Sequence, residues 1–234
     1  MHLLTSLLTT VLITVTFAAP SAKPKAAHAI SSALARADQG IKPGTGTSGG
    51  FFYYFWSDNV EPVTYNNHEG GRYTVKWGDG TGNFVAGKGW NSESVDTLKT
   101  VVYNGTWSTT GNAYLSLYGF TSNPMVEYYI LENYGSYDPS TTAEKKGSVT
   151  SDGEVYNIHT RRFILQDLEG ARLIHQVLSI RQTKRTAGTI TPKNHFDAWR
   201  NLNVTLGKHD FAVLATEGYR SSGEADITVG ERTA

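Results

Sequence analysis

The sequence lacks two features that restrict the classes of protein it can belong to. Its 234 residues include no cysteine, and 21 Lys and Arg residues balance 21 Asp and Glu residues. Without disulfide bonds the fold must be stabilised by packing alone, for which about 190 residues are enough. Without an excess of positive charge the chain has no electrostatic attraction for nucleic acids or anionic membranes. We therefore expect no nucleic-acid partner.

No hydrophobic run reaches the roughly 20 residues that a comfortable transmembrane helix needs. Residues 3–17 are apolar or small and are followed by Ala18 and Ala19. This pattern predicts a signal peptide over residues 1–19 and a secreted, extracellular protein that keeps no membrane segment after cleavage. A buried N-terminal helix is the alternative. Residues 20–49 are expected to form a propeptide and linker, with a trimming site after Arg36.

What the sequence does contain is typical of β-structure. Glycine occurs 24 times and aromatic residues make up 12% of the chain. Strand-like runs alternate with turn signals roughly every 8–12 residues, without a repeat or a charge block between them. One helix is expected over 191–203, with Thr191 as N-cap and Pro192 at the first helical position. We predict one domain over residues 50–231, an all-β jelly roll of two packed antiparallel twisted sheets with a single α-helix.

Three of the predicted strands have a tyrosine-rich side and a side of small or aliphatic residues. In residues 113–120 the first side carries Tyr114, Ser116, Tyr118 and Phe120. Two other strands place a glutamate on the corresponding side, Glu127 beside Tyr129 and Glu217 beside Tyr219.

A curved sheet with such a face forms a groove that suits a sugar chain. Aromatic rings stack on the C–H faces of pyranoses, and tyrosine hydroxyls bond their hydroxyl edges. Glycoside hydrolysis needs two carboxyl groups there, one ionised and one kept protonated by its partner's charge and by burial. Glu127 and Glu217 are the candidates.

The two glutamate segments, "MVEYYILENYGSYDPS" and "ATEGYRSSGEADITV", resemble the catalytic motifs of the glycoside hydrolase family 11 endo-1,4-β-xylanases. Further similar motifs occur in the family's order, namely "FWSDN", "VTYNN", "GNFVAGKGW", "YLSLYGF", "KKGSVTSDG", "SIRQTKR" and "NHFDAW". The resemblance covers residues 50–230. It implies a jelly roll that cleaves internal β-1,4 bonds of xylan with retention of configuration.

The resemblance also implies roles for individual residues. Glu127 matches the nucleophile and Glu217 the general acid/base, or proton donor. Trp56 matches a tryptophan that stacks on the sugar on the non-reducing side of the cleaved bond. Asn83 matches a pH-tuning position beside the acid/base. An Asn at this position makes the chain similar to family members that work near neutral pH. The other residues that match substrate-binding positions are Tyr114, Tyr118, Tyr129, Arg162, Gln176 and Tyr219.

The sequence departs from the family pattern in the loop that presses on the substrate. Gln166, Asp167 and Leu168 stand where the family usually has Pro-Ser-Ile at the tip of this thumb. In the next strand, Val177 and Leu178 replace two large aromatic residues. A xylan-binding protein on a catalytically weakened scaffold is therefore one alternative, and a related family 12 β-glucanase is another.

The remaining polar and aromatic residues have simpler interpretations. The histidines show no metal-ligand spacing, so we expect neither a metal nor a cofactor. We expect the protein to be a monomer and to bind xylan or xylo-oligosaccharides. Two sequons, at Asn104 and Asn203, fit a secreted glycoprotein. We interpret Glu132, Glu154, Glu224 and Glu231 as surface charges, and Trp77, Trp90, Trp107 and Trp199 as structural residues.

Overall fold

The fold is built almost entirely from strands that belong to one hydrogen-bonded sheet. The computed structural model describes residues 40–58, 63–78, 80, 82–91, 97–167 and 170–232, without the side chains of 165–167 and 170–172. The predicted signal peptide and residues 20–39 lie outside the described residues. The chain divides into two units after Arg36, and the sheet belongs to the second, Ala37–Ala234.

The strands run in chain order along this second unit. They are β1 (Gly44–Ser48), β2 (Phe51–Ser57), β3 (Val63–Asn67), β4 (Arg72–Trp77), β5 (Asn83–Trp90), β6 (Val101–Ser122), β7 (Val126–Tyr134), β8 (Glu144–Ser151), β9 (Glu154–Asp167), β10 (Gly170–Arg181), β11 (Gly188–Ile190) and β12 (Lys208–Glu231). The helices are the 3-10 helix η2 (Pro139–Thr142) and the α-helix α2 (Pro192–Asn201). Strand β1 lies within the stretch predicted as linker, so the sheet begins at Gly44.

The all-β jelly roll with a single α-helix is confirmed for the described residues, but its two layers are not separate sheets. The strand order is β1-β2-β5-β12-β6-β7-β10-β9-β8, with β3, β4 and β11 attached beside this path. The long strands β6 and β12 run through both layers and connect them. The pairing is not purely antiparallel either, because β7 and β10 are parallel.

Strand β12 passes from one layer to the other at a bend. Residues 212–219 pair with β5, and residues 223–228 pair with β4. Between them the register against β6 shifts, and Arg220 has a φ of 47°. An irregularity of this kind bends the strand, which lets one chain segment serve both layers.

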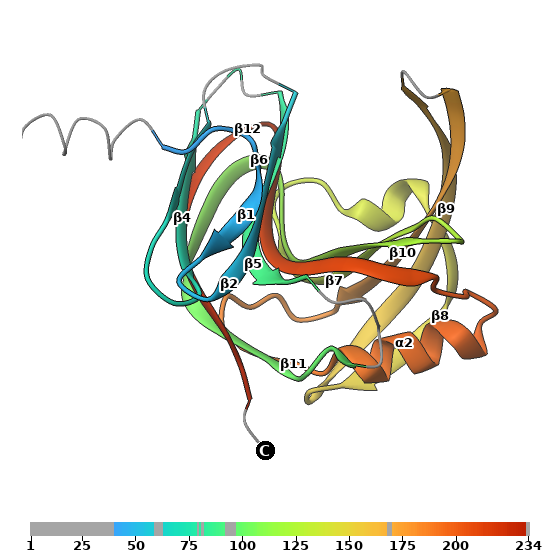
Figure 1. Cartoon of the computed structure of the whole chain (residues 1–234). Coiled ribbons are helices and arrows are strands. Elements are labelled where there is room, and N and C mark those ends of the chain that lie inside the picture. The colour runs from blue at the N-terminus through green and yellow to red at the C-terminus, as the bar shows by residue number, and fades with distance from the viewer. Residues whose placement is uncertain are drawn as a thin grey trace, which may run out of the picture. The chain divides into compact units, whose positions relative to one another are not determined.

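Helix α2 covers the back of the sheet, opposite the tyrosine-rich face. Its Phe196 and Trp199 are buried in the main core with Tyr128 of β7 and Val177 of β10. The helix begins at Pro192 as predicted, but Thr191 makes no side-chain capping bond. Its hydroxyl donates instead to Asp152 in the β8–β9 turn, at 2.8 Å. Figure 1 shows α2 lying across β8, with the hairpin of β9 and β10 projecting away from it.

The expectation that Glu132 is a surface charge is wrong. Glu132 is 1% exposed and accepts hydrogen bonds from Tyr103 and Tyr156, each 2.6 Å long. The Arg185 guanidinium completes the cluster by an ion pair with the same carboxylate. These partners come from β6, β9 and the segment before β11, so the buried charge links distant parts of the sheet.

The structural role expected for the tryptophans other than Trp56 is confirmed. Trp77 and Trp199 are buried, and Trp90 and Trp107 pack partly buried against the core. Both sequon asparagines, Asn104 and Asn203, are exposed. No helix among the described residues has the length and apolarity to cross a membrane.

Candidate active site

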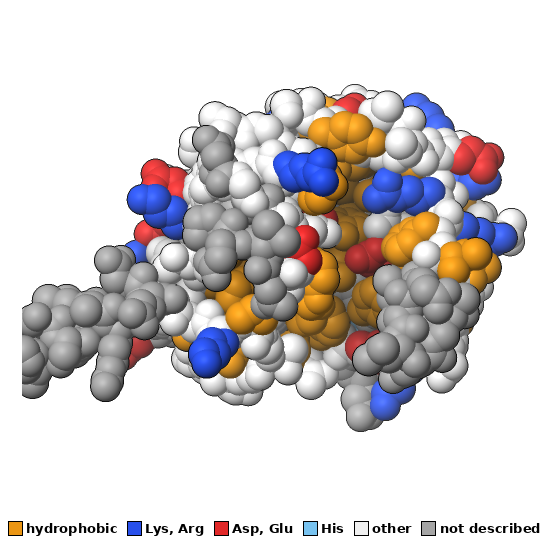
Figure 2. Space-filling model, turned by 90° about the horizontal axis from the view of Figure 1, so that it is seen from above, with side chains coloured by type: hydrophobic (Ala, Val, Ile, Leu, Met, Phe, Trp, Pro, Cys, Tyr) orange, Lys and Arg blue, Asp and Glu red, His pale blue; other side chains and the backbone are white. Residues whose placement is uncertain are grey.

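The predicted tyrosine-rich face exists and has its own cluster of packed side chains. We call this face, with Glu127 and Glu217 on it, the groove. Its buried members are Val85, Tyr114, Tyr118, Tyr129, Leu131, Leu178, Ile180, Val213 and Ala215. The alternate residues of the same strands, such as Leu115 and Leu117 of β6, belong to the main core on the other side. Figure 2 shows a hollow lined with hydrophobic side chains, with acidic side chains among them.

Three hydrogen-bond donors hold the carboxylate of Glu127, which projects from β7. The Tyr118 and Tyr129 hydroxyls donate to Oε1, at 3.0 and 3.2 Å. The Gln176 side-chain amide donates to Oε2 at 2.6 Å. Gln176 is the parallel-strand neighbour of Glu127, which explains how β10 supplies this contact. Donors on both oxygens fix the orientation of this carboxylate.

Glu217 on β12 has the opposite environment. Its Oε2 atom is buried and has no hydrogen-bond partner among the described residues. Burial, followed by the negative charge of Glu127, raises the pKa of Glu217 from its ordinary 4.5 to about 8. The Tyr129 hydroxyl and the charge of Arg161 oppose this rise. At neutral pH the groove therefore holds one protonated carboxylic acid and one carboxylate anchored by three donors.

The contacts of Tyr129 show that the carboxyl groups of Glu127 and Glu217 lie close together. The Tyr129 hydroxyl donates to Glu127 at 3.2 Å and also lies within hydrogen-bonding reach of Glu217, although its single proton serves one carboxyl group at a time. Since a hydrogen bond spans about 3 Å, the nearest oxygens of the two groups lie within roughly 6–7 Å. Retaining glycosidases place their carboxyl groups about 5–5.5 Å apart, a separation that lies within this bound.

Aromatic rings occupy the rim on the Glu217 side. Trp56 is 42% exposed and lies in the same cross-strand row as Val85 and Glu217. Tyr219 is also 42% exposed, two residues beyond Glu217 on β12. Tyr114 is the direct β6 neighbour of Glu217 and is buried. These rings offer both exposed platforms and buried walls to a sugar chain.

Tyr54 belongs to the groove although it was absent from the expected site residues. Its ring stacks on Phe211 with centroids 4.7 Å apart. Burial and the charges of Glu127 and Glu217 raise its pKa to about 12. The sequence signal for this position is its spacing, because Tyr54 stands two residues before Trp56 on β2 and therefore lies on the same face of the sheet.

Asn83 lies where the resemblance places it, beside the strand that carries Glu217. It pairs across the sheet with Tyr219, and its backbone N–H donates to Asp58 at 2.8 Å. Within the described residues its side-chain oxygen Oδ1 is buried without a partner, as is Glu217 Oε2.

Arg162 does not join the other predicted site residues. On β9 it pairs with His175, and both point away from the groove, whereas the preceding residue Arg161 pairs with Gln176. Arg161 Nε donates to the side-chain oxygen of Gln176. The arginine that contacts the site is therefore Arg161. Of the predicted thumb tip, Leu168 and the side chains of Gln166 and Asp167 lie outside what the structure describes.

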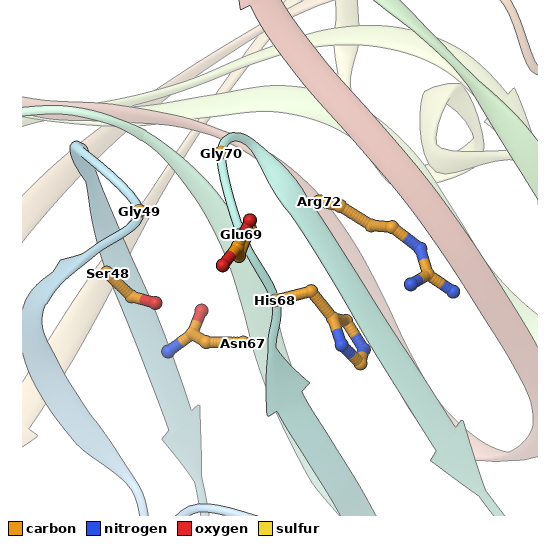
Figure 3. A pocket seen from close by; sticks show the side chains of 7 residues that line it. All are labelled: Ser48, Gly49, Asn67, His68, Glu69, Gly70 and Arg72. Atoms are coloured by element: carbon orange, nitrogen blue, oxygen red, sulfur yellow. The ribbon is translucent and has the colours of Figure 1, made fainter.

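A second hollow lies away from the glutamates, at the β1–β2 and β3–β4 turns. Figure 3 shows its lining by Ser48, Gly49, Asn67, His68, Glu69, Gly70 and Arg72. Beneath it Lys88 is buried and donates to the carbonyls of His68 and Gly70, at 2.6 and 2.8 Å. Arg72 is paired with Asp226 at 2.8 Å. Lys88 also donates to the Ser48 hydroxyl at 3.5 Å, so this one side chain contacts both turns.

Known proteins have similar sequences over most of this chain. The "Ethylene-inducing xylanase 1" of Botryotinia fuckeliana is 52% identical over 195 residues, 83% of this chain and 68% of that protein. The "Probable endo-1,4-beta-xylanase B" of Aspergillus clavatus is 50% identical over 186 residues, covering 79% and 82% of the two chains. "Endo-1,4-beta-xylanase I" of Cochliobolus carbonum is 47% identical over 194 residues, covering 82% and 86%. Residues 48–228 match the family model described as "Glycosyl hydrolases family 11". With its fold and its paired carboxyl groups, the chain belongs to glycosyl hydrolase family 11.

Proposed function

We propose that the protein is a secreted endo-1,4-β-xylanase that hydrolyses internal β-1,4-xylosidic bonds of xylan by a retaining double displacement. The observation that carries this proposal is the pair of neighbouring carboxyl groups in one groove, one anchored by donors and one kept protonated. Relatives named as xylanases, at about half identity over most of the chain, support xylan as the substrate. Residues 50–231 form the proposed catalytic domain, preceded by a signal peptide (1–19) and a propeptide and linker (20–49). The active species is a monomer.

In the first step Glu127 attacks the anomeric carbon and forms a covalent glycosyl ester. Tyr118, Tyr129 and Gln176 hold its carboxylate in one orientation, so little reorganisation precedes the attack. Glu217 gives its proton to the glycosidic oxygen, and the leaving sugar departs as an alcohol. The raised pKa of Glu217 ensures that this proton is present near neutral pH.

In the second step the same residue acts as a base. Once Glu127 is esterified, its negative charge is gone, and one of the two causes that raise the pKa of Glu217 disappears. Glu217, now ionised, takes a proton from water, which attacks the anomeric carbon and frees Glu127. The Glu127 charge thus switches its partner between acid and base.

Substrate binding follows the row of rings across the sheet. Trp56 stacks on a sugar on the non-reducing side of the cleaved bond, and Tyr219 and Tyr114 contact the chain near Glu217. Asn83 is the proposed pH-tuning residue, on the strand beside that of Glu217 and with a buried side-chain oxygen. Arg162 matches a substrate-binding position by resemblance, but it lies on the face opposite the groove and has no substrate contact in our proposal.

The alternative, a xylan-binding protein without turnover, rests on the altered thumb. A protein that only binds needs no acid held protonated beside a donor-anchored carboxylate, so this alternative is not favoured. The paired carboxyl groups would cost a binding protein stability without benefit.

Release of reducing ends from soluble xylan tests the proposal. The full chain secreted from a host should release reducing ends from xylan. It should release fewer or none from cellulose or mixed-linkage glucan. Glu127→Gln should lower turnover at least about 10³-fold while xylan binding persists. Glu224→Gln is the matched control, because Glu224 is an exposed glutamate of the same strand as Glu217. Binding of xylan without release of reducing ends by the wild-type chain would favour the binding protein instead.

A further inference from the structure

An exposed arginine lies over one of the aromatic rings at the rim of the groove. Arg220 follows Tyr219 on β12, and its guanidinium carbon lies 5.2 Å from the centre of the Tyr219 ring. Tyr219 is itself 42% exposed and stands two residues beyond Glu217. Arg220 therefore brings a positive charge to the rim on the Glu217 side.

The bend of β12 explains why these two successive side chains lie together. In a regular strand Tyr219 and Arg220 would point to opposite faces of the sheet. Here the register against β6 shifts between Tyr219 and Ser222, and Arg220 has a φ of 47°. This left-handed conformation is uncommon for a residue with a long side chain, and such conformations cluster at functional sites. The Arg220 backbone N–H donates to the Gly82 carbonyl at 3.2 Å, which ties the bend to the segment before β5.

The guanidinium of Arg220 keeps its hydrogen-bond donors available. An arginine side chain has five N–H donors and stays charged at every pH at which proteins are folded. In the part of the chain that the structure describes, no acceptor bonds these donors and no carboxylate forms an ion pair with Arg220. Arg72 on β4 shows the contrast, because Asp226 occupies its guanidinium at 2.8 Å. Contact with an aromatic face restricts a guanidinium without using its donors, so Arg220 is positioned and still free to bind a carboxylate.

The charges of the groove make such a cation useful for acidic substrates. Glu127 is the proposed carboxylate nucleophile, so it repels a sugar chain that carries negative branches and not a neutral chain. The guanidinium of Arg161 is already bound to Gln176 and Thr142. An unoccupied guanidinium at the rim compensates the repulsion, and it can hold a carboxylate by two parallel hydrogen bonds.

We propose that Arg220 is a specificity-determining residue that binds the carboxylate of a uronic acid branch on the xylan chain. This inference rests on the proposed function and deepens it, since it names xylan with acidic substituents as the preferred class of substrate. The neutral sugars of the main chain lie against the rings of the groove, and the branch extends past Tyr219 to the guanidinium.

Kinetics on matched xylo-oligosaccharides test the proposal. One substrate is linear, and the others carry a single uronic acid branch, each on a different sugar of the same main chain. The ratio of kcat/KM for the best branched substrate to that for the linear one isolates the effect of the branch. Since an exposed ion pair is weak, Arg220→Gln should lower this ratio about two- to fivefold. The wild-type ratio should fall toward that of the variant in about 1 M NaCl, which screens exposed charges. Arg220→Lys keeps the charge but not the planar fork, so it should retain part of the preference.

Two controls separate the charge of the branch from other effects. The methyl ester of the uronic acid has nearly the same size and no charge, so its ratio should be the same in the wild type and in Arg220→Gln. Arg200→Gln is the matched variant, because Arg200 is an exposed arginine of α2, on the back of the sheet. It changes the net charge equally and should leave every ratio at its wild-type value.

Several outcomes would overturn the inference. An unchanged ratio in Arg220→Gln for every branched acid would do so, and so would an equal fall with the methyl esters or in Arg200→Gln. If a thermal melt shows that Arg220→Gln does not fold, the wild type still decides, because equal kcat/KM values for an acid and its ester contradict the proposal. Failure of the proposed function would look different, since the wild-type chain would then not cleave the linear substrate.

Discussion

Glu217→Gln should make the protein more stable, and increasingly so as the pH rises. In the folded chain burial and the Glu127 charge raise the pKa of Glu217 to about 8, against an ordinary value of 4.5. A carboxyl group with a raised folded pKa binds its proton more tightly in the folded state. Ionising it therefore favours unfolding, and the cost grows as the pH rises from about 4.5 to about 8. Glutamine has the same shape and carries no such cost.

The magnitude follows from the difference of about 3.5 between these two pKa values. At about 1.36 kcal/mol per pKa unit, the destabilisation is about 2 kcal/mol at pH 6 and approaches about 5 kcal/mol above pH 8. For a domain of this size, 2 kcal/mol corresponds to a rise in Tm of roughly 4–8 °C. At pH 4 the wild type and the variant should melt together.

Thermal denaturation of the wild type and Glu217→Gln between pH 4 and pH 9 measures this difference. Glu224→Gln, an exposed change in the same strand, should show no comparable dependence on pH. Glu127→Gln should reduce the pH-dependent cost without abolishing it, because burial is the larger of the two causes. A Tm difference between Glu217→Gln and the wild type that stays constant across this range would refute the reasoning.

Three further predictions concern Glu132, Trp56 and the pH dependence of turnover. Glu132→Ala should destabilise the fold by about 3–5 kcal/mol, because it leaves Arg185, Tyr103 and Tyr156 without their buried acceptor. Denaturant unfolding measures this difference, and a change below about 1 kcal/mol would contradict the role of this cluster. Trp56→Ala should raise KM for long xylo-oligosaccharides severalfold with a smaller effect on kcat, since its ring is 42% exposed and lies apart from the carboxyl groups; a loss confined to kcat would argue against a stacking platform. The kcat/KM of the wild type should fall as the pH rises through about 8, where Glu217 loses its proton; a fall that begins below pH 6 would conflict with that pKa.

The groove could be predicted from the sequence because strand alternation is a local property. Residues 113–120 of β6 and 211–219 of β12 alternate with period two, so each side chain's face follows from its neighbours. The structure places these faces as expected, with Tyr114 and Tyr118 in the groove and Leu115 and Leu117 in the core.

The arginine in the site could not be predicted in this way. Whether Arg161 or Arg162 faces Gln176 depends on the register of β9 against β10, and a slip of one residue exchanges the two faces. That register is set across a hairpin whose tip departs from the family pattern, so motif matching selected the wrong neighbour for the contact with Gln176.

Glu132 shows a second limit. Glu132 alternates with Glu127 and so lies on the opposite side of β7, but we interpreted it as a surface charge because carboxylates are rarely buried without partners. Its partners Tyr103, Tyr156 and Arg185 lie 29, 24 and 53 residues away. Only the tertiary structure brings them together. The merging of the two layers into one sheet likewise depends on how far β6 and β12 extend.

The central claim is that Glu127 forms a covalent bond with the sugar during turnover. A fluorinated xylobioside with a good leaving group slows the second step and should trap the ester. Mass spectrometry of the digested protein should then find one added fluoroxylobiosyl group, a disaccharide, on the peptide containing Glu127, and none in Glu127→Gln. A label on another residue, or turnover of xylan with no label on Glu127, would contradict the account.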